Sequence, residues 1–223
     1  IALGKLTQSL AYGARTLLVE GDFDACLQLV QRASEELGIY LLNSINPFRL
    51  EGQKTIVLEM LQQLAWDVPE WIVLPAGNLG NTAAFGKALL EAYEWGLIPR
   101  LPRLAAIQAE GASPFAQAFA RDFDRLVPMA AHTVATAIKI GAPASYDRAV
   151  RAIRATHGVV RSVTDAEILA AKAAIDAAGV GCEPASAATL AGIRQLRADG
   201  VIRSGERVVG VLTGHVLKDP GIL

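Results

Sequence analysis

The chain has 223 residues, of which 52% are apolar and 19% charged, and its formal net charge is −1. This composition can bury a large apolar core and excludes a disordered chain. The 21 basic residues balance the 22 acidic ones and form no basic run, which argues against a general binder of nucleic acid or anionic membranes. No apolar stretch is long enough to predict a membrane-spanning helix. Cys26 and Cys182 predict no disulfide framework and indicate a cytoplasmic protein.

Short apolar runs alternate with longer helical patterns along the chain. The predicted strands cover residues 15–20, 39–42, 71–74, 104–108, 159–163 and 208–212. The predicted helices cover 6–14, Asp22 or Asp24 to Leu37, 50–65, 82–95 and 165–178. Thr164 and Glu167 form the pattern of a capping box before the last of these helices. The alternation predicts an α/β fold with a mostly parallel sheet flanked by helices, and ligands bind at the carboxyl ends of the strands in such folds.

The most specific feature is a Gly/Asn loop between the strand at 71–74 and the next helix, Gly77-Asn78-Leu79-Gly80-Asn81-Thr82. Amide N–H groups at a helix N-terminus favour an anion, and Asn78, Asn81 and Thr82 add polar side chains. The loop lacks the lysine of a nucleoside-triphosphate loop and the spacing of a dinucleotide fingerprint. It therefore favours a single phosphate monoester. The alternative is an ordinary strand-to-helix turn with an Asn cap.

The same loop resembles the phosphate-binding loop of fold-type II pyridoxal-phosphate enzymes, and the whole chain resembles the threonine synthase family. The further matching segments, in family order, are 43–55, 108–112, 136–141, 182–187 and 212–215. The resemblance implies a tryptophan synthase β-like architecture that lacks its N-terminal part. Residues 1–38 would end a smaller domain, and residues 39–223 would form the larger cofactor-binding domain.

The resemblance also implies roles for individual residues around pyridoxal 5′-phosphate. The residues expected to hold the cofactor phosphate are Gly77, Asn78, Leu79, Gly80 and Asn81. Thr213 would place its hydroxyl on the pyridine nitrogen. Glu183 and Ser186, at another strand-to-helix junction, would either face the cofactor or only suit a helix N-terminus that has proline at its first position.

Asn43, Ser44 and Arg49 are the candidates for gripping the phosphate of the substrate, because a guanidinium can hold a phosphate through two N–H bonds. The alternative for Arg49 is a solvated residue paired with an acid. Lys54 is predicted to be a charge partner of Glu51 rather than a catalytic lysine. The three histidines have no metal-type spacing, so no metal site is expected.

The activity implied by the resemblance converts O-phospho-L-homoserine and water into L-threonine and phosphate. The expected binding partner is this small-molecule substrate, not nucleic acid or a membrane. The family resemblance also implies a homodimer. The family's Schiff-base lysine lies in a Ser-Phe-Lys-Asp-Arg-Gly type motif that does not occur in these 223 residues. The chain alone is therefore expected to be inactive, with no catalytic residue of its own. Two alternatives stay open: a serine/threonine dehydratase-like enzyme, and a non-catalytic remnant that binds a phosphate ligand.

Overall fold

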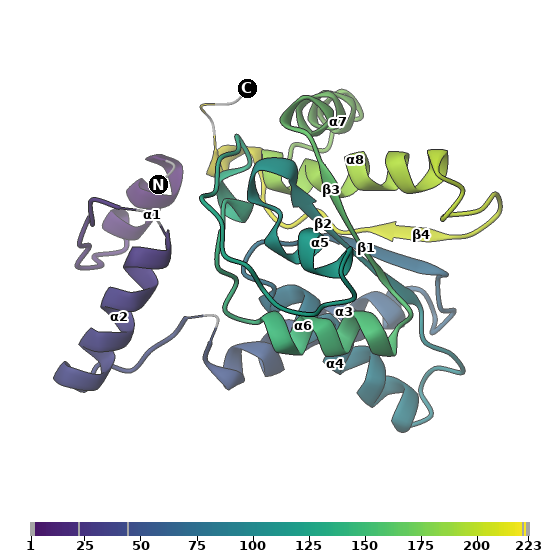
Figure 1. Cartoon of the computed structure of the whole chain (residues 1–223), viewed down its shortest axis with the longest axis horizontal. Coiled ribbons are helices and arrows are strands. Elements are labelled where there is room, and N and C mark those ends of the chain that lie inside the picture. Colours follow the sequence, from purple (N-terminus) through teal and green to yellow (C-terminus); the bar gives the residue numbers. More distant parts are fainter. Residues whose placement is uncertain (1–2, 22, 44, 220, 222–223) are drawn as a thin grey trace.

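A computed structural model describes residues 3–21, 23–43, 45–219 and 221, and its centre is a four-stranded parallel sheet (Figure 1). The strands are β1 (Trp71–Pro75), β2 (Arg103–Ala109), β3 (Val159–Val163) and β4 (Val208–Gly210), in the order β3-β2-β1-β4. Trp71 lies opposite Arg103 on one side and Val208 on the other. The strands predicted at 71–74, 104–108 and 159–163 are confirmed, and the one at 208–212 is confirmed for its first three residues.

Helices cover both faces of this sheet (Figure 1). One face carries α3 (Pro47–Gln63), α4 (Gly80–Glu94), α5 (Pro114–Phe119) and α6 (Tyr146–Ala155), and the other carries α7 (Asp165–Ala177) and α8 (Pro184–Ala198). Successive side chains of β1 point to opposite faces. Ile72 and Leu74 therefore join the core cluster under α3, α4 and α6, whereas Trp71 and Val73 join the cluster under α7 and α8. The predicted α/β architecture is thus confirmed.

Capping side chains fix where two helices begin. The Asn46 side chain accepts a hydrogen bond from Phe48 N–H at 2.9 Å, and Pro47 occupies the first helical position, so α3 starts at residue 47 rather than at the predicted residue 50. The predicted capping box is present at α7. Thr164 Oγ1 accepts the Glu167 N–H at 3.2 Å, and Glu167 Oε2 accepts the Thr164 N–H at 2.7 Å.

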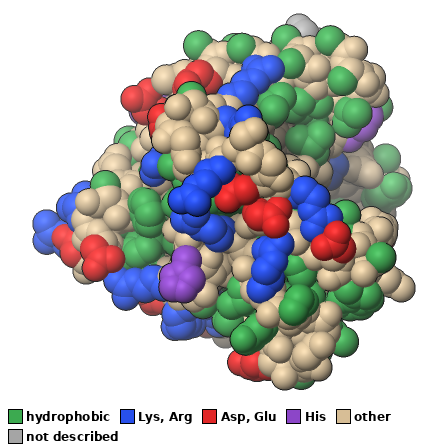
Figure 2. All heavy atoms as spheres, turned by 90° about the vertical axis from the view of Figure 1, so that its right-hand side faces the viewer, with side chains coloured by type: hydrophobic (Ala, Val, Ile, Leu, Met, Phe, Trp, Pro, Cys, Tyr) green, Lys and Arg blue, Asp and Glu red, His purple; other side chains and the backbone are tan. Residues whose placement is uncertain are grey.

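The amino ends of the strands carry charges of both signs. Arg100 pairs with Glu70 at 2.6 Å, and Arg207 pairs with Asp67 at 2.7 Å. The molecular face in Figure 2 likewise shows acidic and basic side chains interspersed rather than a patch of one sign. Among the described helices, none has both the length and the apolar character needed to cross a membrane.

The first described segment lies beside the sheet rather than on it (Figure 1). It contains α1 (Leu3–Ala11) and α2 (Phe23–Leu37), close to the predicted helices, and α1 lies next to the short helix η3 (Val216–Lys218). The strands predicted at 15–20 and 39–42 are wrong, because both stretches are irregular and most of their apolar side chains are exposed. A strand needs a neighbour to pair its backbone groups, and no described strand runs beside either stretch.

Candidate functional site

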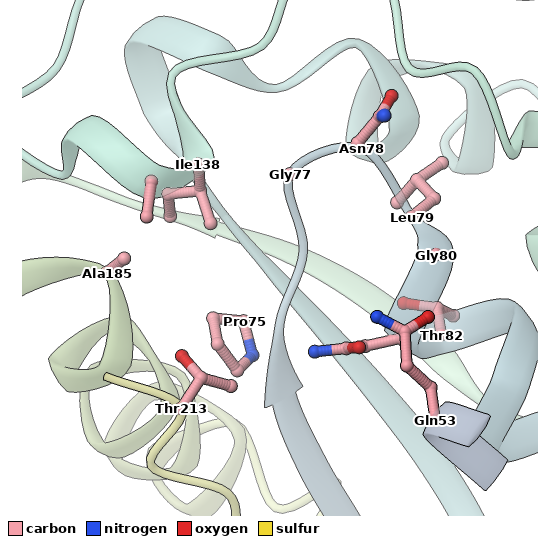
Figure 3. Close-up of a pocket in the computed structure, with 12 residues that line it drawn as sticks. Gln53, Pro75, Gly77, Asn78, Leu79, Gly80, Thr82, Ile138, Ala185 and Thr213 are labelled. Carbon is pink, nitrogen blue, oxygen red and sulfur yellow. The ribbon is translucent and has the colours of Figure 1, made fainter. Parts of the chain in front are cut away.

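A pocket of about 230 Å³ opens at the carboxyl ends of β1 and β4 (Figure 3). The lining residues are Gln53, Pro75, Gly77, Asn78, Leu79, Gly80, Asn81, Thr82, Ala137, Ile138, Ala185 and Thr213. All six residues predicted for the cofactor, from two segments more than a hundred positions apart, line this one pocket. The position agrees with the general rule for ligand sites in parallel sheets.

The β1–α4 loop presents the N-terminus of α4 to the pocket. Leu79 is the N-cap, in the left-handed conformation with φ 65°, and helical bonding begins with Ala83 N–H to Leu79 O at 3.0 Å. The amides of the first turn have no acceptor within the helix, so they are available to an anion. A non-glycine residue rarely adopts this conformation, so the loop is held in one shape by its surroundings.

Gly77 is required by close packing. A Cβ atom added there would come within 3.0 Å of Ile138 Cα and 3.1 Å of Ala137 O. Both atoms belong to the backbone of the short helix η2 (Thr136–Ile138), which forms the opposite wall and cannot yield as a flexible side chain would. Any larger residue would therefore displace the loop or the wall.

Two buried polar atoms in the pocket lack a hydrogen-bond partner among the described residues, Thr82 Oγ1 and Gln53 Oε1. The Thr82 side chain is 0% exposed and lies near Gln53 beside the start of α4 (Figure 3). An unpaired buried polar group costs stability, and a ligand that supplies the missing bond removes that cost. Sequence reasoning included Thr82 but missed Gln53, whose only signal was its place in the matching segment 43–55.

Asn78 holds the loop to its surroundings. Its Oδ1 accepts the Ala144 N–H at 2.6 Å, and its backbone carbonyl accepts the Ser145 N–H at 3.2 Å. These bonds join the pocket loop to the residues that lead into α6. Asn78 thus lines the pocket while its side-chain oxygen is engaged with the protein.

Thr213, three residues beyond β4, lies across the pocket from Gly77 (Figure 3). Its hydroxyl is 3.0 Å from Ser186 Oγ in the first turn of α8. Ser186 and Glu183 were expected either to face the cofactor or only to suit the start of a helix. Neither residue lines the pocket, and Ser186 instead contacts Thr213. Glu183 is buried against Gly214, where an added Cβ would clash with Glu183 Oε1.

The predicted substrate-binding residues are not part of this pocket. Ser44 lies outside the described residues, Asn43 is half-buried, and Arg49 is exposed in the first turn of α3. Within the described part of the chain, the Arg49 guanidinium has no ion-pair or hydrogen-bond partner.

Lys54 pairs with Glu51 at 2.6 Å, as predicted, and also with Glu91 at 2.7 Å. Hydrogen bonds first to Glu51 and then to Glu91 raise the pKa of the Lys54 ammonium above its usual range. Lys54 is therefore a fixed cation in a network between α3 and α4, which does not suit a nucleophilic amine.

None of the residues that line the pocket is ionisable, so any attraction for an anion has to come from the backbone. Gly80 and Ala185 bring the N-termini of α4 and α8 to the same cavity, and each carries the positive end of a helix dipole. Within the described residues, no group of three His, Cys, Asp or Glu side chains could hold a metal ion. A phosphate monoester fits this site. The helix amides and the unpaired Thr82 hydroxyl can donate hydrogen bonds to it, and Gly77 leaves no side chain in its way.

Comparisons with known proteins agree with this chemistry. The model of the family described as pyridoxal-phosphate dependent enzyme matches residues 2–214. The chain is 46% identical to the threonine synthase of Methanocaldococcus jannaschii over 99% of its length, and 49% identical to that of Methanosarcina acetivorans over 99%. It covers 55% of each of these relatives, so it spans about half their length.

Solved structures share the fold at lower identity. An L-serine ammonia-lyase from the fungus Rhizomucor miehei has a TM-score of 0.80 at 22% identity, with 96% of this chain and 67% of that chain covered. The Escherichia coli threonine synthase has a TM-score of 0.72 at 24% identity, with 94% and 49% covered. These likenesses establish a fold-type II architecture for the described sheet and its helices.

Proposed function

Because the chain belongs to the family of pyridoxal-phosphate-dependent enzymes, we propose that it is the cofactor-binding part of a threonine synthase. The cofactor of this family is pyridoxal 5′-phosphate. The proposed reaction converts O-phospho-L-homoserine and water into L-threonine and phosphate. The curated relatives that match at 41–49% identity are threonine synthases, which favours the synthase over a dehydratase-like enzyme.

One observation carries the proposal: a loop that suits a phosphate and a hydroxyl that suits a ring nitrogen lie on opposite sides of one pocket. The amides of Gly80 and Asn81 would bind the cofactor phosphate, and Gly77 would let the backbone approach it. Thr213 would bind the ring nitrogen. When bound, the cofactor supplies an electron sink, and the protein contributes position and local charge.

The remaining assignments belong to the same proposal. Residues 1–38 would end a smaller domain, and residues 39–223 would form the larger domain, with Asn43, Ser44 and Arg49 close to the boundary. In that position the free Arg49 guanidinium would meet the phosphate of the substrate as the cleft between the domains is formed. A homodimer in the cytoplasm completes the proposed setting.

Cofactor affinity tests the phosphate assignment. Pyridoxal 5′-phosphate is titrated into the 223-residue chain and binding is followed by the absorbance of the ligand, with pyridoxal, which lacks the phosphate, as the comparison. We expect the phosphate to raise affinity at least about tenfold, since hydrogen bonds to a charged group contribute about 1.5–3 kcal/mol each. Gly77→Val should abolish this difference, because its side chain would meet the backbone of Ile138.

Gly52→Ala is the matched control, since a Cβ at Gly52 has no neighbour within 4 Å. Equal affinities for the two ligands would contradict the phosphate assignment. The reaction is tested separately, with the product of the complete reading frame that includes this chain: release of phosphate and threonine from O-phospho-L-homoserine is expected, and ammonia release from serine or threonine would favour the dehydratase.

A further inference from the structure

The Ser186 hydroxyl is buried and lies at the centre of a small hydrogen-bond cluster beside the pocket. Ser186 is 0% exposed, and its Oγ accepts the backbone N–H of Thr213 at 2.9 Å and that of Gly214 at 2.8 Å. The same oxygen is 3.0 Å from Thr213 Oγ1. A fourth, longer contact of 3.4 Å reaches Gly214 O.

Counting protons and lone pairs assigns a direction to the contact between the two hydroxyls. A hydroxyl oxygen has one proton to donate and two lone pairs that accept. The two backbone N–H groups occupy both lone pairs of Ser186 Oγ, so this atom cannot also accept a proton from Thr213. The shorter of its two remaining contacts is the one to Thr213 Oγ1, so Ser186 donates and Thr213 accepts.

The proton of Thr213 then has no acceptor within the described protein, because Ser186 is the one described residue that its hydroxyl contacts. Thr213 lines the pocket, so the unused proton is available to a ligand there. We propose that Ser186 is a positioning residue that fixes the Thr213 hydroxyl as a hydrogen-bond donor into the pocket. This inference rests on the proposed function, which places the cofactor ring nitrogen at Thr213.

A fixed donor has a chemical consequence at the atom it meets. A hydroxyl that can only donate stabilises an unprotonated ring nitrogen and disfavours a protonated one, which would itself need an acceptor. Without Ser186, the Thr213 hydroxyl could turn and accept, and protonation of the ring nitrogen would become easier. Glu183, buried against Gly214, and Cys182 and His215, which pair in an isolated β-bridge, are ionisable groups beside this cluster, and all three are retained in every variant below.

The test measures the protonation of the ring nitrogen directly. Pyridoxal 5′-phosphate labelled with ¹⁵N in the ring is bound to the chain, and the ¹⁵N chemical shift is followed as pH is lowered. For Ser186→Ala we expect a titration midpoint about one pH unit or more above that of the wild type, roughly a tenfold change in the protonation equilibrium. Ser186→Thr, which keeps the hydroxyl, should restore the wild-type midpoint.

Thr189→Val is the matched control. Thr189 is also a buried hydroxyl of α8, but its Oγ1 donates to Val211 O at 3.0 Å and does not contact Thr213. Removing it perturbs the same helix and should leave the midpoint unchanged. Should Ser186→Ala fail to fold, Ser186→Cys supplies a weaker donor and acceptor and should give an intermediate midpoint.

The outcomes separate this inference from the proposed function. A Ser186→Ala midpoint equal to that of the wild type would overturn the positioning role, even with the cofactor bound as proposed. A wild-type chain that does not bind the cofactor, or a Thr213→Val midpoint equal to that of the wild type, would instead overturn the placement of the ring nitrogen at Thr213, and the inference with it.

Discussion

The sheet region (residues 68–219) and the leading segment (residues 3–46) contain similarly apolar sequence but differ in what covers it. In the sheet region, leucines and isoleucines of the strands and helices are buried on both faces. In the leading segment, Leu17, Tyr40 and Leu42 are among the many large apolar side chains that are exposed. The contrast teaches that an apolar run forms a strand only where a neighbouring strand and a covering helix are available.

The largest expected difference between the two regions is in how much a leucine-to-alanine substitution lowers the free energy of unfolding. Leu89 is 0% exposed in α4, and Leu17 is 88% exposed. Leu89→Ala should lower the free energy of unfolding by about 2–5 kcal/mol, because it leaves a cavity, whereas Leu17→Ala should change it by less than about 0.5 kcal/mol. Urea unfolding of the two variants measures both values. A comparable loss for Leu17→Ala would mean that the leading segment is buried in solution.

A second comparison uses two helical glycines, one inside the sheet region and one at its border. A Cβ at Gly86 would clash with Ala152 Cβ, where α4 crosses α6, whereas Gly52 in α3 faces open space. Gly86→Ala should destabilise the chain by about 1–3 kcal/mol through overpacking. Gly52→Ala should stabilise it by about 0.5–1 kcal/mol, because alanine favours a helix. Thermal unfolding measures whether each substitution stabilises or destabilises the chain. If Gly86→Ala stabilised it as Gly52→Ala does, the packing of α4 on α6 would be contradicted.

The smallest expected effect concerns the capping box of α7 and depends on pH. The Thr164 N–H bond is the main reason that the pKa of the Glu167 carboxyl lies below its ordinary value of 4.5. A lowered pKa in the folded state means that the carboxylate stabilises the fold above the ordinary pKa, and that this stabilisation is lost as pH falls through the folded value. Glu167→Ala should therefore cost about 1 kcal/mol at neutral pH and much less in acid.

The control for this prediction is Glu94→Ala, at the exposed end of α4, which should change stability little at either pH. Urea unfolding at neutral pH and again below the folded pKa measures the difference. A cost for Glu167→Ala that is the same at both values would exclude the ionised carboxylate as its source.

Sequence patterns were sufficient for the sheet because its strands are short, mostly apolar runs bounded by turns, of which Trp71–Pro75 is the most continuous. They failed at 15–20 and 39–42 because the same signal does not say whether a partner strand exists. For the pocket, the Gly/Asn loop was identifiable from its residue types, whereas Thr213 was indicated only by the family resemblance. Ala137 and Ile138 were not singled out individually, since they contribute backbone and packing rather than chemistry, and Gln53 was missed because one polar residue on a helix carries no periodic signal.

The pairing of β4 with β1 has a consequence for how the protein is made. Glu70 and Arg207, which are hydrogen-bonded where these two strands begin, are 137 positions apart in the chain. During synthesis, β1 and the Gly/Asn loop leave the ribosome long before β4 and Thr213 do. The pocket therefore cannot form until β4 and Thr213 have been synthesised. A nascent chain stopped before residue 208 has an exposed β1 edge and no Thr213 to complete the site.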